Sequence, residues 1–242
     1  MSNRRHKKPI GQTGRIRTTH SRGDPIITWE PIEFPAEKQA QELMIASAFA
    51  KQLSSNVGTC WTVQQLTEND FDFLLRSSTD SRYLELQEII IPPSKKGIPY
   101  ASRDQVVQSK KFSATIISEI RKKAVRYPKA TTCTLDLLVY VTHWRFVTSD
   151  TVRKLVAHYL RRNAHPFANV YEFSIFDEAS GAIQVLFPND AWLGNFHPSA
   201  AVAHRYVNID PATRRPVKNA DGSIGVGFNI APETLAKLRS TI

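Results

Sequence analysis

Acidic and amide side chains recur at two-residue steps in two neighbouring segments of the chain. Asp70 and Asp72 stand at the start of an apolar run, and Glu85 and Gln87 lie inside the next one. Because side chains two residues apart on a strand point to the same side, each pair would share one face of a sheet. A buried carboxylate is costly unless it finds a cation or another partner. These four side chains are therefore the first candidates for chemistry.

The chemistry that this group favours is the binding of a divalent cation. If the two strands pair through their short turn, the side chains converge, and Glu42 at the edge of a helical apolar stripe could face the same patch. Mg²⁺ or Mn²⁺ would take a few carboxylate and carbonyl oxygens there and polarise a phosphoryl oxygen. Either Asp70 or Asp72 could be the ligand beside Glu85, and both stay open. The competing interpretation is that the acids line a solvent-facing sheet surface.

Hydrophobic periodicity predicts the elements that would position these residues. Helices are predicted at residues 36–53, at 109–127, from 149 or 150 onward, and from Pro232. Strands are predicted around 60–63 and at 71–76, 82–91, 133–141, 169–176 and 182–187, with a further hairpin turn at 219–222. Helices that alternate with apolar strands predict an α/β fold, in which helices flank one central mixed sheet.

This order of elements, with its acidic motifs, resembles the PD-(D/E)xK nuclease superfamily, which has the restriction endonuclease-like fold. Such a core runs α-β-β-β-α-β, and the resemblance covers residues 36–187. Asn69-Asp70 resembles the Pro-Asp motif of the family, and Glu85-Leu86-Gln87 resembles its Glu-x-Lys motif. Glu42 resembles the additional helical acid. The resemblance implies metal ligands at Asp70 or Asp72 and at Glu85, with Gln87 and Glu42 assisting.

Two residues depart from the family pattern. Asn69 replaces the proline, and Gln87 stands where lysine is expected. Glutamine can hydrogen-bond a water but brings no positive charge, although some family members are similar in carrying it. With these two departures, the resemblance implies a metal-dependent nuclease that hydrolyses phosphodiester bonds in DNA. The alternative is a catalytically inactive protein of the same fold that binds nucleic acid or acts as an assembly component.

The net charge of +10 on 242 residues is unevenly placed. Residues 1–23 hold seven of the 32 Lys and Arg residues and no acid. A basic arm on a mildly basic body is typical of a protein with an anionic partner, most often nucleic acid, and DNA is favoured over RNA here. The predicted nucleic-acid contacts are Arg4, Arg5, Lys7, Lys8, Lys110, Lys111, Lys122 and Lys123. The alternatives are that the arm is a solubilising tail or binds another polyanion, and that the helix lysines are only solvated.

Composition divides the chain into three parts. Residues 1–35 form a basic, flexible arm, residues 36–190 the nuclease-like α/β core, and residues 191–242 a turn-rich extension with a short helix. No apolar run approaches the ~18 residues of a membrane span, and the N-terminus lacks the apolar segment of a signal peptide. Cys60 and Cys133 suggest neither a disulfide framework nor a zinc site. We expect a cytoplasmic protein without membrane contact. The sequence is compatible with a homodimer or a larger assembly.

Overall fold

A six-stranded mixed sheet forms the centre of the protein, as seen in a computed structural model that describes residues 13–21, 24–66, 71–90, 105–127 and 134–239. In spatial order its strands are β3 (Thr62–Gln65), β4 (Phe73–Arg76), β5 (Ser81–Glu88), β7 (Leu135–Val141), β8 (Asn169–Asp177) and β9 (Ser180–Phe187). β4 is antiparallel to β3 and β5, whereas β5, β7 and β8 are mutually parallel. β9 closes the far edge antiparallel to β8. The predicted α/β fold with a central mixed sheet is confirmed.

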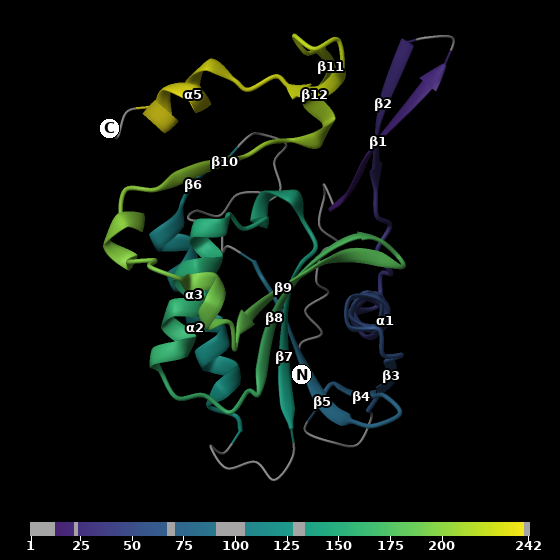
Figure 1. Cartoon of the computed structure of the whole chain (residues 1–242), viewed down its shortest axis with the longest axis vertical. Coiled ribbons are helices and arrows are strands. Elements are labelled where there is room, and N and C mark those ends of the chain that lie inside the picture. Colours follow the sequence, from purple (N-terminus) through teal and green to yellow (C-terminus); the bar gives the residue numbers. More distant parts are fainter. Residues whose placement is uncertain (1–12, 22–23, 67–70, 91–104, 128–133, 240–242) are drawn as a thin grey trace.

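Helices cover both faces of this sheet (Figure 1). α1 (Lys38–Val57) packs on one face, and α2 (Ser109–Ala124) and α3 (Asp150–Arg162) pack on the other. Alternate residues of β7 serve the two cores: Leu137 lies under α2 and α3, and Leu138 lies under α1. All seven residues of β7 are buried, as its nearly continuous apolar sequence predicts.

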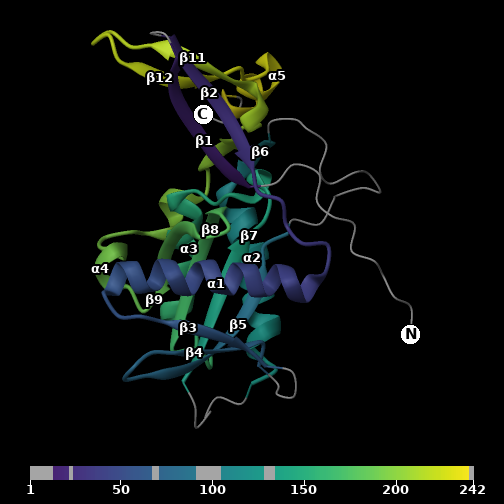
Figure 2. The same cartoon turned by 90° about the vertical axis from the view of Figure 1, so that its right-hand side faces the viewer.

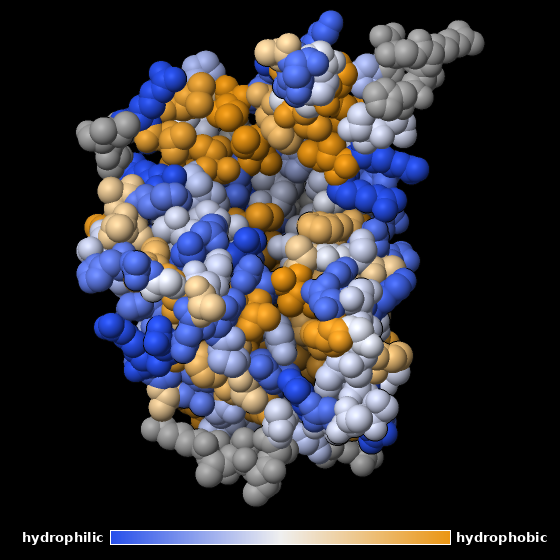
Figure 3. Space-filling model, viewed as in Figure 1, coloured by the Kyte–Doolittle hydropathy of each residue, from blue (hydrophilic) through white to orange (hydrophobic). Residues whose placement is uncertain are grey.

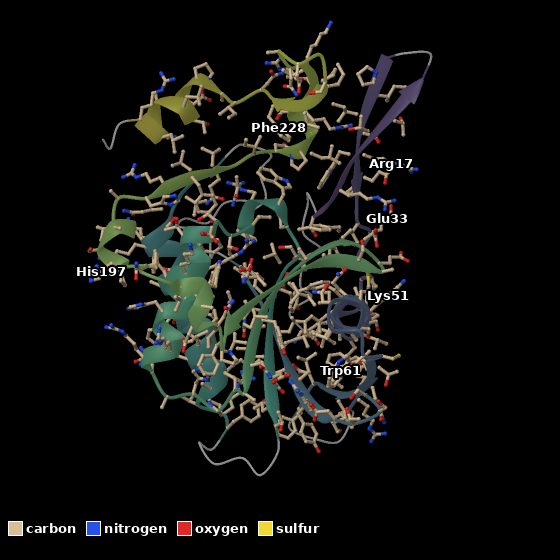
Figure 4. The ribbon with its side chains drawn as sticks, in the orientation of Figure 1. Arg17, Glu33, Lys51, Trp61, His197 and Phe228 are labelled. Carbon is tan, nitrogen blue, oxygen red and sulfur yellow. The ribbon has the colours of Figure 1, made fainter. Side chains whose placement is uncertain are left out.

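The second half of the predicted arm forms a β-hairpin rather than an extended segment. β1 (Gly14–Ser21) and β2 (Asp24–Pro31) pair antiparallel and project beside the C-terminal elements (Figures 1 and 2). Arg15 links this hairpin to the sheet, because its Nη1 lies 3.0 Å from Asp177 Oδ2 while its Nε lies 2.7 Å from Glu30 Oε2. Figure 4 shows Arg17 on the hairpin and Phe228 across from it on the C-terminal elements.

The C-terminal extension first runs along α3 and then reaches the same end of the molecule as the hairpin (Figure 1). It consists of α4 (Asp190–Leu193), β10 (Arg205–Asn208), β11 (Arg214–Lys218), β12 (Ile224–Phe228) and α5 (Pro232–Arg239), with short 3₁₀ helices η2 (Pro198–Ala201) and η3 (Pro211–Thr213). β10 pairs antiparallel with β6 (Gln105–Gln108), and β11 pairs with β12 around the predicted turn. Within the described ranges, no helix has the length and apolar character needed to cross a membrane.

Candidate active site

The β4–β5 strand pair brings Asp72 and Glu85 together. Asp72 immediately precedes β4, and Phe73 of β4 pairs with Leu84 of β5, so the register sets the two acids beside each other. The main-chain N–H of Asp72 donates to Glu85 Oε1 at 3.0 Å, and the main-chain N–H of Leu86 donates to Asp72 Oδ2 at 2.9 Å. The structure therefore places these two predicted residues in one cluster, while Asp70 lies outside the described residues.

Lys123 of α2 completes this acidic cluster. Its Nζ lies 3.3 Å from Asp72 Oδ2 and also forms an ion pair with Glu85 Oε2. The side chains of Lys123 and Glu85 are only 11% and 1% exposed, so little water screens their attraction. The chain thus places one cation against two carboxylates, in surroundings where an unpaired charge would be costly.

The position of Lys123 follows from the helical period of α2. Ile116 and Ile120 are buried against the sheet, and Lys123 falls on the same stripe, three residues after Ile120. The prediction of Lys123 as an exposed phosphate ligand rests on its basic neighbours, but its spacing from the two isoleucines is the signal that directs it inward. Lys122, by contrast, is 65% exposed and pairs with Glu119 at 2.6 Å.

Tyr127, which follows α2, is a further member that sequence reasoning did not identify. It forms a hydrogen bond with Glu85, and its ring stacks on Phe71 at a centroid distance of 5.4 Å. Burial raises the pKa of Glu85, and the charge of Asp72 adds to this, although Lys123 and Tyr127 favour the ionised form. Burial and the neighbouring Glu85 also raise the pKa of Tyr127, so its hydroxyl remains protonated and can donate.

Two predicted residues, Glu42 and Gln87, lie beside the cluster. Glu42 is half-buried on α1 and pairs with Lys38 at 3.3 Å. Burial raises the pKa of Glu42, while Lys38 opposes the rise and the charge of Asp72 contributes to it. Gln87 is on the same strand face as Glu85, and its Nε2 donates to the main-chain oxygen of the next residue at 3.0 Å. Among the described residues, Gln87 makes no hydrogen bond to either carboxylate of the cluster.

The predicted nucleic-acid contacts fall into three groups. Lys110 and Lys111 are exposed at the start of α2, and Lys122 is exposed near its end. Lys123 lies in the acidic cluster instead of on the outer face of the helix. The contacts predicted in the arm lie outside the described residues: Arg4, Arg5, Lys7 and Lys8.

The carboxylate oxygens of the cluster are the kind of ligand that a hard cation prefers, but the cluster offers too few of them. No three His, Cys, Asp or Glu side chains of the described ranges form a group able to hold a metal ion. Asp72 is one-third exposed, however, and Mg²⁺ is commonly held by one or two carboxylates together with substrate phosphates. Asp72 and Glu85 therefore fit Mg²⁺ only with further ligands from substrate and water. Comparisons with known proteins give no relative, since no family model, curated protein or solved structure matches this chain.

Proposed function

We propose that the protein is a metal-dependent nuclease that hydrolyses phosphodiester bonds in DNA. The observation that carries this proposal is the convergence of Asp72, Glu85 and Lys123 from two adjacent strands and the helix that covers them. The carboxylates could hold a divalent cation, and the ammonium group beside them could offset negative charge on the phosphoryl oxygens. The net charge of +10 favours a polyanionic substrate.

The order of elements supports a restriction endonuclease-like core. α1, β3, β4, β5, α2 and β7 follow one another in the α-β-β-β-α-β order, with the short strand β6 inserted before α2. β7 lies parallel to β5 and next to it, and α1 and α2 lie on opposite faces of the sheet. This support is an analogy at the level of fold, so the weight of the proposal rests on the cluster.

In the proposed reaction, Lys123 supplies the positive charge that Gln87 does not bring. Its ammonium group would move from Asp72 to a non-bridging phosphoryl oxygen and offset the negative charge that develops there. Gln87, on the same strand face as Glu85, would hydrogen-bond the attacking water through its amide. A bound Mg²⁺ would polarise the phosphoryl oxygen and lower the pKa of a coordinated water. Tyr127 would keep Glu85 oriented through their hydrogen bond.

A second candidate function is binding of nucleic acid without cleavage. It is favoured by the way Lys123 already neutralises both carboxylates, and by the lack of a three-acid group among the residues that the structure describes. In such a protein the cluster would stabilise the fold, and the exposed lysines would provide affinity. Binding would then weaken steeply with salt and would not respond to chelators.

Cleavage assays on plasmid and single-stranded DNA, with Mg²⁺, Mn²⁺ or EDTA, separate these functions. We expect metal-dependent cleavage that Glu85→Gln reduces at least about 100-fold, whereas DNA binding by this variant persists. Glu119→Gln serves as the control, since within the described ranges the ion-pair partner of Glu119 is the exposed Lys122 on the outer side of α2. Binding without cleavage under every metal condition would establish the second candidate. Cleavage that is unchanged in Glu85→Gln would refute the assignment of this cluster as the active site.

A further inference from the structure

A cavity of about 420 Å³ lies apart from the acidic cluster, at the other end of the sheet. The hairpin contributes Trp29 to its wall, the 3₁₀ helix η1 (Trp144–Phe146) contributes Trp144, and the end of β8 contributes Phe176. Its volume is within the range of about 300–1,000 Å³ that is typical of small-molecule sites. Figure 3 shows that hydrophobic residues gather at this end of the molecule, between the hairpin and the C-terminal elements.

The cavity lies where ligands commonly bind in α/β proteins. β7 and β8 are parallel, and the cavity is built from residues that follow or end these strands, including Trp144, Ser174 and Phe176. The carboxyl ends of parallel strands form the crevice in which open α/β sheets bind ligands. The hairpin covers this edge, since the main-chain N–H of Thr13 donates to the main-chain oxygen of Thr142 at 3.0 Å.

Arg153 is the charged side chain in the wall of the cavity. Arg153 Nε donates to Thr148 Oγ1 at 3.0 Å and to Glu172 Oε2 at 3.2 Å. The side chain of Arg153 is 26% exposed, so part of it remains open to a ligand in the cavity.

From this combination we infer that the cavity binds a nucleotide, with the base among the aromatic side chains and the phosphate on Arg153. Tryptophan faces stack on any base, and the planar guanidinium of arginine suits phosphate oxygens. Glu172 is buried and pairs with Arg153, so it helps to hold the guanidinium in the wall of the cavity. The nucleotide can be a free mononucleotide or an unstacked nucleotide of a bound strand, since both offer the same base and phosphate. This site does not depend on phosphodiester cleavage at Glu85.

Titration of the full chain with dAMP in EDTA tests the inference. Trp29 and Trp144 are two of the four tryptophans, so intrinsic fluorescence and calorimetry can both follow binding. Ala182, an exposed residue of the cavity wall, allows Ala182→Trp to fill the cavity without disturbing the core. We expect this variant to weaken dAMP binding by roughly two orders of magnitude, because the indole occupies the space of the base. Ala200→Trp, on the exposed η2, is the matched control. Thermal unfolding of each variant verifies that the fold persists.

A series of related ligands tests whether the cavity recognises both base and phosphate, and whether the nucleotide is free or part of a strand. Deoxyadenosine, which lacks the phosphate, and ribose 5-phosphate, which lacks the base, should each bind at least about tenfold more weakly than dAMP. If a single-stranded oligonucleotide displaces dAMP, the cavity binds a nucleotide of a nucleic-acid strand. If it does not, the cavity binds a free mononucleotide. Equal binding of ribose 5-phosphate and dAMP, tighter binding of 1-naphthoate, or unchanged dAMP binding by Ala182→Trp would overturn the inference.

Discussion

Replacing Lys123 by methionine should destabilise the protein mainly at neutral and alkaline pH. Methionine keeps the buried alkyl chain but leaves Glu85, which is 1% exposed, without its cation. Removing one partner of a buried ion pair typically costs about 3–5 kcal/mol. Glu85 can limit this cost by taking up a proton, since one pKa unit corresponds to about 1.36 kcal/mol. From an ordinary pKa of about 4.3, protonation at pH 7 costs at most about 4 kcal/mol, and at pH 5 about 1 kcal/mol.

The sign of the pH dependence follows from the same proton. Burial already raises the pKa of Glu85, and loss of Lys123 raises it further. Between the unfolded and folded pKa values, the folded state binds more protons, so stability falls as pH rises. We therefore expect Lys123→Met to lose about 3 kcal/mol of unfolding free energy at pH 7 and about 1 kcal/mol at pH 5.

Urea unfolding of the wild type and the variants at both pH values measures these losses. Lys122→Met is the matched control, because its exposed pair with Glu119 should contribute no more than about 0.5 kcal/mol. Adding Glu85→Gln to Lys123→Met should recover most of the loss at pH 7, since no buried charge then remains. A Lys123→Met loss equal to that of Lys122→Met, or one that is the same at both pH values, would refute the buried ion pair.

Three further predictions concern the rest of the fold. Burial raises the pKa of Asp136 to about 6, so between pH 4 and pH 7 the wild type should lose roughly 2.4 kcal/mol of unfolding free energy relative to Asp136→Asn, and urea titrations that show no such divergence would contradict this. Phe49→Ala should cost about 3–5 kcal/mol because Phe49 is fully buried, whereas Leu43→Ala at a 37% exposed position should cost less than about 1 kcal/mol in the same assay. Gly181→Ala should lower the unfolding free energy by about 1–3 kcal/mol, since the added methyl would lie 2.4 Å from the buried ring of Phe173, and an unchanged melting temperature would show that the ring yields.

The elements with strong periodicity could be predicted from sequence, and those formed by distant pairing could not. β7 is nearly all apolar and bounded by polar residues, so both its type and its burial follow from its composition. The pairing of β6 with β10 joins two four-residue strands that are far apart in the chain, and neither has a period of its own. The β1–β2 hairpin is likewise held by pairing, and its threonines and arginines are equally compatible with an extended segment.

Side-chain direction was the harder problem even where the element itself could be predicted. The three- and four-residue steps of α1 place Leu43 and Ala46 on one stripe, yet Leu43 is exposed and the buried face is centred on Ile45 and Phe49. In α1 several overlapping stripes are apolar, so packing against the sheet selects among them. The directions of Asp72 and Glu85 are easier to predict, because the two-residue period of the strands and the short turn between them define one face. Their contact then follows from the pairing of β4 with β5.

The absence of a positive charge at Gln87 can be tested directly by introducing a lysine. A lysine at position 87 would share the strand face of Glu85, about 7 Å further along the strand, within reach of its carboxylate. Gln87→Lys in the Lys123→Met background should therefore restore about half of the unfolding free energy lost at pH 7, because an ammonium group again faces Glu85. The single variant Gln87→Lys should not gain stability, since Lys123 already occupies the carboxylate. If the double variant is no more stable than Lys123→Met, a strand lysine cannot replace the helical one, and the cation that Glu85 requires must come from α2.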